Sequence, residues 1–301
     1  MSARVKVAAC QYPIEPVGSM AAWTAKLDRL IAEAARGGAR LVVIPEYASM
    51  ELTSVLPRAA QADLGLQLEH LQALLPEYRG VYAELARRYG VYVLAGSFPE
   101  RVGLADGDQF RNRARLYAPS GVDGVVEKLQ MTRFERERWG VARGDGGVVF
   151  DTELGAIGVA ICYDSEFPLL VRRLVEQGAR IVLVPSCTDA MSGYWRVRIA
   201  CQARALENQC YVVQAPTVGS APWSIAVDDN HGAAAIYAPP DRGFPDSGVV
   251  AMGVPDQAAW VTAELDLDLV EAARLDGAVL NHRDWVRSRH LDAPVSRVSL
   301  R

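Results

Sequence analysis

Apolar runs of strand length alternate with stretches of helical periodicity up to about residue 215. The apolar runs predict buried strands, because a strand covered on both faces has few polar positions. They cover residues 6–12, 40–47, 92–97, 113–118, 156–162, 180–185 and 211–215. The helical periodicity predicts helices over residues 21–35, 66–89 (interrupted at Pro76), 168–177 and 194–208. This alternation indicates an α/β fold.

The last third of the chain has a different pattern. Residues 224–266 contain short strand-like segments separated by Gly and Pro turns, and residues 269–274 predict a brief helix. Together with the earlier runs, this gives roughly ten to twelve strands, more than the half dozen or so of a doubly wound sheet. Two sheets packed face to face, with helices outside, would bury them all. We expect one domain over residues 1–278, followed by an extended C-terminal arm over 279–301, where periodicity is weak.

Composition excludes several classes of protein. Half of the 301 residues are hydrophobic and 23% are charged, which is too apolar for a disordered chain. The formal net charge is −4 and no basic stripe stands out, so we expect no nucleic-acid partner. Arg111, Arg113 and Arg115 alternate as one face of a strand would, which predicts a solvated face. Neither a signal peptide nor a membrane-spanning run is visible, so we expect no membrane contact.

The five cysteines are scattered along the chain, and none forms a C-x-x-C pair. This pattern predicts neither a disulfide framework nor a zinc site. Free thiols of this kind fit a reducing cytoplasm, where most are buried and inert.

Three reactive side chains stand at or just beyond the ends of predicted strands. Cys162 follows an apolar run and precedes a helix, so its side chain can point out of the sheet beside free backbone N–H groups. Glu46 ends the run VVIPE, where a buried carboxylate needs an ion-pair or hydrogen-bond partner or has a functional role. Lys128 follows another strand-like segment. Taken singly, Cys162 is equally well a structural cysteine, Glu46 fits an exposed first loop residue, and a lone lysine such as Lys128 is nearly always on the surface.

Their conjunction favours chemistry, because strand ends on one side of a sheet converge in space. A carboxylate, an ammonium and a thiol are a base, an oxyanion stabiliser and a nucleophile, which suffice for acyl transfer. The four histidines fall in segments that resemble helix surface or loop, and only His231 stays as an alternative base.

The segments VVIPEYAS, EKLQMTRFERERWG and GVAICYDSEFP, in this order and approximate spacing, resemble the nitrilase superfamily of carbon–nitrogen hydrolases. The resemblance runs from AACQYP to about Asp266. It implies a four-layer α-β-β-α sandwich with Glu46 as general base, Cys162 as nucleophile and Lys128 as oxyanion stabiliser. It also implies that Glu135 orients Lys128 and substrate, and that the Tyr163 backbone N–H completes the oxyanion site.

The resemblance further implies an enzyme without metal or organic cofactor that assembles as a homodimer or higher homo-oligomer. The arm after Ala278 would suit a subunit contact. Many relatives have His where this chain has Gln130, and most have Glu where it has Leu169. These departures concern substrate recognition more than the chemistry.

The substrate follows from the resemblance only in outline. We expect a small aliphatic amide, such as one derived from an amino acid, with N-carbamoyl amino acids second and nitriles third. An acyltransferase and a catalytically silent scaffold protein are the alternatives from other classes. Arg196 or Arg198 would suit a substrate carboxylate, although both fit a helix surface. The predicted substrate-binding residues are Tyr47, Trp139, Cys187, Thr188, Asp189, Tyr194 and Trp195.

Overall fold

The computed structural model describes residues 4–105, 107–288 and 296–299. Its strands join in the order β4-β5-β3-β2-β1-β11-β10-β9-β8. The first half of this path comprises β4 (Phe98–Leu104), β5 (Gly107–Tyr117), β3 (Tyr92–Leu94), β2 (Leu41–Val43) and β1 (Arg4–Pro13). The second half comprises β11 (Tyr211–Ser220), β10 (Ile181–Ser186), β9 (Gly155–Val159) and β8 (Val149–Thr152). The two halves meet where β1 pairs in parallel with β11.

Shorter strands complete the sheet. They are β6 (Asp123–Glu127), β7 (Val141–Ala142), β12 (Asp229–Asn230), β13 (Ala235–Tyr237), β14 (Val249–Met252) and β15 (Ala259–Asp266). Every apolar run predicted as a strand overlaps an observed one, but the bounds differ. The run over 40–47 yields only the three residues of β2, whereas β5 begins at Gly107, six residues before the apolar run. That polar first part pairs with β4 along its whole length, so tertiary pairing outweighs the local pattern there.

The helices lie outside the strands. They are α1 (Met20–Arg36), α2 (Arg58–Gln61), α3 (Leu64–Leu71), α4 (Leu75–Tyr89), α5 (Pro168–Glu176), α6 (Met191–Asn208), α7 (Leu267–Asp276) and α8 (Asn281–Ser288). Pro76 lies in the first turn of α4, where its missing N–H costs nothing, so the predicted interruption at this residue is a helix start. In the described part of the chain, no helix has the length and apolar character needed to cross a bilayer.

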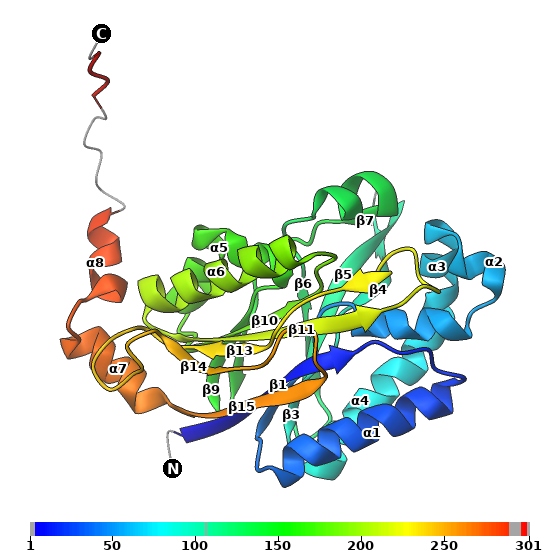
Figure 1. Cartoon of the computed structure of the whole chain (residues 1–301), viewed down its shortest axis with the longest axis horizontal. Helices are drawn as coiled ribbons and strands as arrows, with labels where there is room; N and C mark the ends of the chain where they lie inside the picture. The colour runs from blue at the N-terminus through cyan, green and yellow to red at the C-terminus, as the bar shows by residue number, and fades with distance from the viewer. Residues whose placement is uncertain (1–3, 106, 289–295, 300–301) are drawn as a thin grey trace.

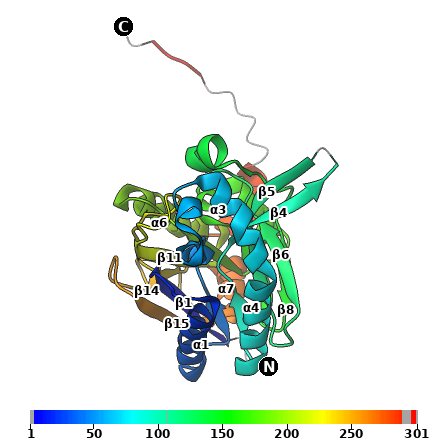
Figure 2. The ribbon, with the colours of Figure 1, turned by 90° about the vertical axis from the view of Figure 1, so that its right-hand side faces the viewer.

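The alternation of side chains along β1 shows how the layers form. Val5, Val7 and Ala9 belong to a core shared with β9, β10 and β11, whereas Ala8, Cys10 and Tyr12 pack with α1 and α4. Helices α5 and α6 cover the other face of the second half, over β10 and β11 (Figure 1). The order helix, sheet, sheet, helix confirms the predicted α/β sandwich of the nitrilase type. The β4–β5 hairpin projects from the body (Figure 2).

The predicted solvated face of β5 is wrong. Arg113 pairs with Glu127 on the neighbouring strand β6 at 2.5 Å, and Arg115 pairs with Glu100 on β4 at 3.1 Å. Arg111 is only 5% exposed, because its guanidinium contacts Glu127 at 2.7 Å. The three arginines therefore form a cross-strand ladder of ion pairs, which the alternation alone does not distinguish from a solvent-facing row.

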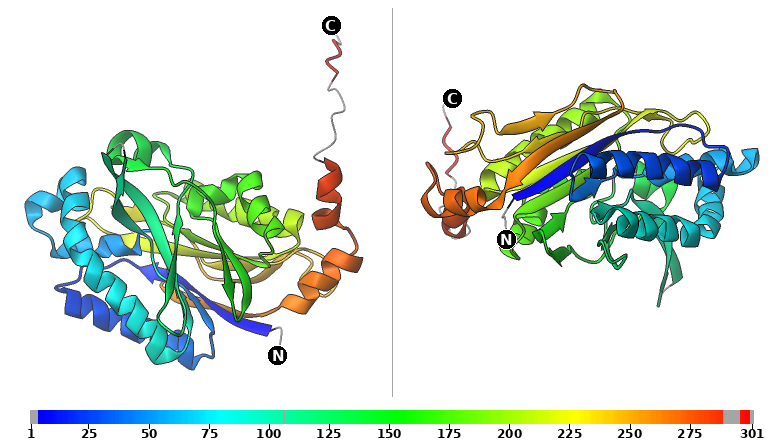
Figure 3. Two further views of the ribbon diagram at one scale, coloured as in Figure 1. Left: turned by 180° about the vertical axis from the view of Figure 1, so that it is seen from behind. Right: turned by 90° about the horizontal axis from the view of Figure 1, so that it is seen from below.

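The extended arm predicted after Ala278 begins instead with a helix, α8. Its backbone accepts a hydrogen bond from Arg172 at His282 O (3.0 Å), and the Arg172 guanidinium lies over the Trp285 ring. These long-range contacts have no counterpart in the local periodicity. Figure 3 shows α7 and α8 at the end of the molecule opposite α3. Residues 289–295 and 300–301 lie outside the described residues, and the division at Ala278 and the role of the arm stay predictions.

Candidate active site

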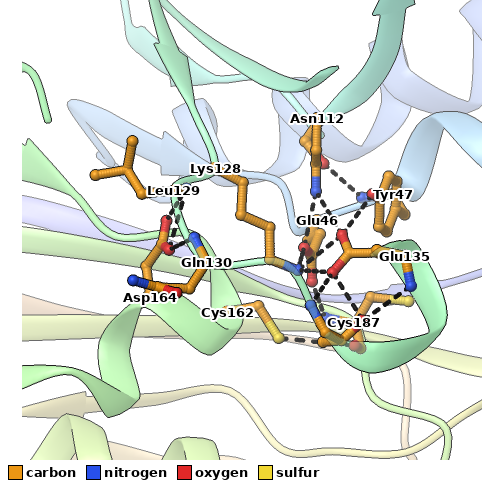
Figure 4. A network of polar contacts seen from close by, with 12 residues as sticks. Glu46, Tyr47, Asn112, Lys128, Leu129, Gln130, Glu135, Cys162, Asp164 and Cys187 are labelled. Carbon is orange, nitrogen blue, oxygen red and sulfur yellow. Dashed lines mark hydrogen bonds and ion pairs between the residues drawn. The ribbon is translucent and has the colours of Figure 1, made fainter. Parts of the chain in front are cut away.

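Three strand ends bring Glu46, Lys128 and Cys162 into one cluster, as the sequence predicts (Figure 4). The chain reaches Glu46 after β2, Lys128 directly after β6 and Cys162 after β9. Lys128 Nζ lies 2.8 Å from Glu46 Oε1. Cys162 Sγ lies 3.7 Å from the carbonyl oxygen of Cys187, whose own N–H donates to Glu46 Oε2 at 3.0 Å. All three catalytic candidates are at most 4% exposed.

The backbone at Cys162 is in the left-handed region, with φ of 49°. A non-glycine residue adopts this conformation only where the surroundings enforce it. Here Ser165 Oγ donates to Cys162 O at 2.6 Å, and the short 3-10 helix Cys162–Glu166 begins at once. The N–H groups of a first helical turn have no partner within the helix. The Tyr163 N–H lies in this turn and Tyr163 lines the cavity beside Cys162, and its role as oxyanion donor stays a prediction.

Lys128 also contacts a second carboxylate. Its Nζ lies 2.9 and 2.7 Å from the two oxygens of Glu135, which further accepts hydrogen bonds from Tyr47 OH at 2.7 Å and Thr132 N at 2.9 Å. Burial alone would raise the pKa of Glu135, but Lys128 and these donors outweigh it and the pKa is lowered. Burial would lower the pKa of Lys128, yet Glu135 and Glu46 hold that pKa well above its usual value. This ammonium stays charged.

The pKa values of Glu46 and Cys162 are both raised. Burial raises the pKa of Glu46 to about 7, against the lowering influence of Lys128, while nearby Glu135 raises it further. Burial, followed by the charge of Glu46, raises the pKa of the Cys162 thiol well above its usual value. The resting pair is therefore a neutral thiol beside a carboxylate with a proton affinity suited to general-base work near neutral pH.

Residues that the sequence analysis missed hold Glu46 in place. Asn112 Nδ2 donates to Glu46 Oε1 at 2.9 Å, and Thr217 Oγ1 donates to the Glu46 carbonyl at 2.8 Å. Tyr47 N donates to Ser97 Oγ at 3.0 Å. One signal for Asn112 was available: it alternates with the arginines of β5, which places a polar amide on the side of the strand that faces the core.

A cavity of about 630 Å³ opens onto this cluster. Five of the predicted substrate-binding residues line it together with Tyr163: Tyr47, Trp139, Cys187, Thr188 and Asp189. The lining residues that the sequence analysis did not predict include Phe134, Arg138, Ile225, Val227 and Asn230.

Tyr194 and Trp195 are not part of this lining, so their prediction as pocket residues is corrected. Helix α6 begins at Met191, and its periodicity turns Tyr194 into the core and Trp195 outward. Arg198 donates to Tyr194 OH at 3.3 Å and lies over the Trp195 ring, so it is not in the cavity either. Arg196 does line the cavity, and its guanidinium lies 3.4 Å from Glu166.

Neither an alternative base nor a metal centre is evident in the described part of the chain. His231 Nδ1 lies 3.0 Å from Asp256, and His231 does not line the cavity. Among the described residues, no group of three or more His, Cys, Asp or Glu side chains is placed to hold a metal ion.

An α/β sandwich with a buried thiol, carboxylate and ammonium at one cavity is the arrangement of a hydrolase with a cysteine nucleophile. A family model described as carbon–nitrogen hydrolase matches residues 6–275. The chain belongs to the carbon–nitrogen hydrolase family.

Two curated relatives and one solved structure illustrate the similarity. "Probable hydrolase YhcX" of Bacillus subtilis is 32% identical over 281 residues, which are 93% of this chain and 53% of that protein. The chain thus spans about half the length of this relative. "Deaminated glutathione amidase" of Synechocystis is 30% identical over 86% of this chain and 91% of its own length. Saccharomyces cerevisiae Nit3, described as a nitrilase-superfamily member, shares the fold with a TM-score of 0.69 at 20% identity, covering 90% of this chain and 93% of its own.

Proposed function

We propose that this carbon–nitrogen hydrolase is an amidase that cleaves a small aliphatic amide through a thioester on Cys162, releasing ammonia and a carboxylic acid. The observation that carries the proposal is the Lys128 ammonium, held between Glu46 and Glu135 at 2.7–2.9 Å beside the thiol. This arrangement supplies a base and a fixed positive charge at the same reacting centre.

In the first half of the proposed cycle, Glu46 takes the Cys162 proton as sulfur attacks the amide carbon. The C=O bond becomes a single bond, and the negative charge on its oxygen faces Lys128 and the Tyr163 N–H. Losing one such donor typically costs about 3 kcal/mol of barrier. The Glu46 carboxylic acid then gives its proton to the amide nitrogen, the C–N bond breaks and ammonia leaves.

In the second half, the thioester is hydrolysed. Glu46, again a carboxylate, takes a proton from water as the water oxygen attacks the thioester carbon. Lys128 and the Tyr163 N–H face the new oxyanion. The C–S bond breaks, the proton returns to sulfur, and the carboxylic acid is released. Glu135 stays ionised and holds Lys128 in both halves, since its pKa is lowered.

The substrate class is argued from the cavity. Trp139, Phe134, Ile225 and Val227 give it apolar walls that suit an aliphatic chain, and its volume of about 630 Å³ suits a small molecule. The name of the Synechocystis relative, a deaminated glutathione amidase, also favours an amide. N-carbamoyl amino acids and nitriles stay second and third.

Ammonia release against a panel of aliphatic amides, N-carbamoyl amino acids and nitriles tests the proposal, with Cys162→Ala protein as the blank. We expect kcat/KM for the best aliphatic amide to exceed that for the best compound of the other two classes by at least about tenfold. Preference for an N-carbamoyl compound or a nitrile would contradict the substrate class, and product diverted to an added amine would indicate an acyltransferase.

The pH dependence of kcat/KM should report Glu46. The base is active only when it is deprotonated, so kcat/KM should fall about tenfold per pH unit below the Glu46 pKa of about 7 and level off above it. Lys128 stays protonated across this range, because its pKa is raised. A rate profile from pH 4.5 to 9 measures this. An acid limb centred near 4.5, the usual value for a glutamate, would contradict the assignment.

A further inference from the structure

Asp164 lies on the turn that carries the nucleophile, two residues after Cys162, and is only 3% exposed. Its Oδ1 accepts hydrogen bonds from Leu129 N at 3.1 Å and from Gln130 N at 2.7 Å. Its Oδ2 accepts from Leu129 N at 3.1 Å. The two donor residues directly follow Lys128, so one carboxylate connects the nucleophile turn to the segment that begins at the ammonium (Figure 4).

This connection joins two parts of the fold that are otherwise separate in the sheet. Lys128 leaves β6, which pairs with β5 in the first half, whereas Cys162 leaves β9 in the second half. On the other side, Lys128 N donates to Asn112 O at 2.9 Å and Lys128 O accepts from Gly144 N at 2.8 Å. Those bonds fix Lys128 to its own half. Asp164 ties the backbone of this segment directly to the nucleophile turn, in addition to the side-chain route from Lys128 through Glu46 and Cys187.

Burying a carboxylate to make this contact is energetically unfavourable. Burial raises the pKa of Asp164 to about 6, although the Leu129 N–H, Lys128 and the Gln130 N–H each lower it. In the described chain no lysine or arginine lies within ion-pair distance of Asp164. An apolar side chain would fill the space without that cost, but it would leave two buried N–H groups without an acceptor. Asparagine could keep both N–H groups on its single oxygen, but its NH₂ group would then face the Leu129 N–H, a donor, where Oδ2 now accepts.

We propose that Asp164 is a positioning residue for the amidase reaction, which fixes Leu129 and Gln130 and thereby places the Lys128 ammonium over the oxyanion formed at Cys162. The inference rests on the proposed function. Figure 4 shows the Lys128 side chain extending from this anchored segment toward Glu46 and Glu135. A displacement of the segment would move the ammonium away from the oxyanion without removing any group that reacts.

A double-mutant cycle between Asp164 and Lys128 tests the proposal. Asp164→Asn should lower kcat about 10- to 100-fold with KM within about threefold, since a misplacement of about 1 Å can cost about 10²-fold. In a Lys128→Met background, the same Asp164→Asn change should alter kcat by less than about twofold. An activated ester serves as substrate, so that slow variants can be measured. Independent, multiplicative effects of the two substitutions would overturn the proposal.

Alkylation of Cys162 by iodoacetamide supplies the second measurement, because this displacement forms no oxyanion. Asp164→Asn should keep the alkylation rate within about threefold of wild type while kcat falls. A parallel fall of both rates would overturn the proposal, because it would show that Asp164 acts only on the nucleophile turn. Asp266→Asn is the control. As the N-cap of α7, Asp266 also accepts a backbone hydrogen bond, from Asp268 N at 3.0 Å, and the kcat of this variant should equal that of wild type.

Two further variants keep the outcomes distinct. Asp164→Ser replaces Asp164→Asn if thermal unfolding shows that the latter does not fold. Cys162→Ala is measured in the same assay. If it turns over like wild type, the proposed function fails, whereas its inactivity together with a full-rate Asp164 variant rejects only the positioning role.

Discussion

Replacing Cys162 with Ala is expected to lower amide turnover by at least about 10⁴-fold while the fold is retained. In the proposed cycle the sulfur forms the covalent bond, and removing a nucleophile that acts as a unit with its base eliminates nearly all of the chemical acceleration. The side chain is small and lies at the cavity wall, so its loss should cost at most about 1 kcal/mol of stability. Ammonia release and thermal unfolding measure the two effects.

The matched control for this variant is Cys201→Ala. Cys201 is fully buried on α6 and does not line the cavity, so its replacement should leave kcat unchanged. Purified Cys162→Ala protein that releases ammonia at the wild-type rate would rule out Cys162 as the nucleophile. Because Cys187 lines the same cavity, thiol labelling is assigned to each cysteine separately.

Replacing Lys128 with Met should lower both kcat and stability. The reaction loses its fixed positive charge, which we expect to cost about 10²- to 10³-fold in kcat. The folded state keeps two buried carboxylates, Glu46 and Glu135, without their shared cation, a change of the kind that costs about 3 to 5 kcal/mol. Steady-state kinetics and urea unfolding measure these losses.

Lys26 provides a matched control within the same chain. It is another buried lysine, paired with the fully buried Glu51 between α1 and the segment after β2, and neither residue lines the cavity. Lys26→Met should therefore lose stability like Lys128→Met but keep its kcat while folded. Equal loss of kcat in both variants would show that Lys128 acts through folding rather than through the oxyanion.

The parts of the fold that follow from local patterns were predictable. The helices from Met20, Pro168 and Met191 were expected to within three residues at each end, because apolar periodicity and glycine stops fix them. Pairing between distant segments was not predictable. The early start of β5 and the ion-pair ladder of its arginines depend on pairing with the adjacent strands β4 and β6, and helix α8 depends on Arg172, 110 residues earlier in the chain.

The same distinction applies to the site. Glu46, Lys128 and Cys162 were predicted because each stands at or beyond a strand end in a recognisable segment. Asn112 and Thr217 were missed. The alternation of Asn112 with the arginines of β5 placed an amide on the core side but did not identify Glu46 as its partner, and the hydroxyl of Thr217 gives no signal of what it faces until the strands are paired. Tyr194 and Trp195 were misplaced because the helix start at Met191, which decides their direction, was expected three residues later.

The central claim is that Cys162 carries the acyl group between two half-reactions. Partitioning of that group between water and hydroxylamine tests it most directly, using an amide, an anilide and an ester with the same acyl part. The leaving group departs before the thioester partitions, so all three substrates give the same intermediate. At one hydroxylamine concentration the ratio of hydroxamate to acid should therefore be identical for all three. A ratio that changes with the leaving group would contradict a common intermediate on Cys162.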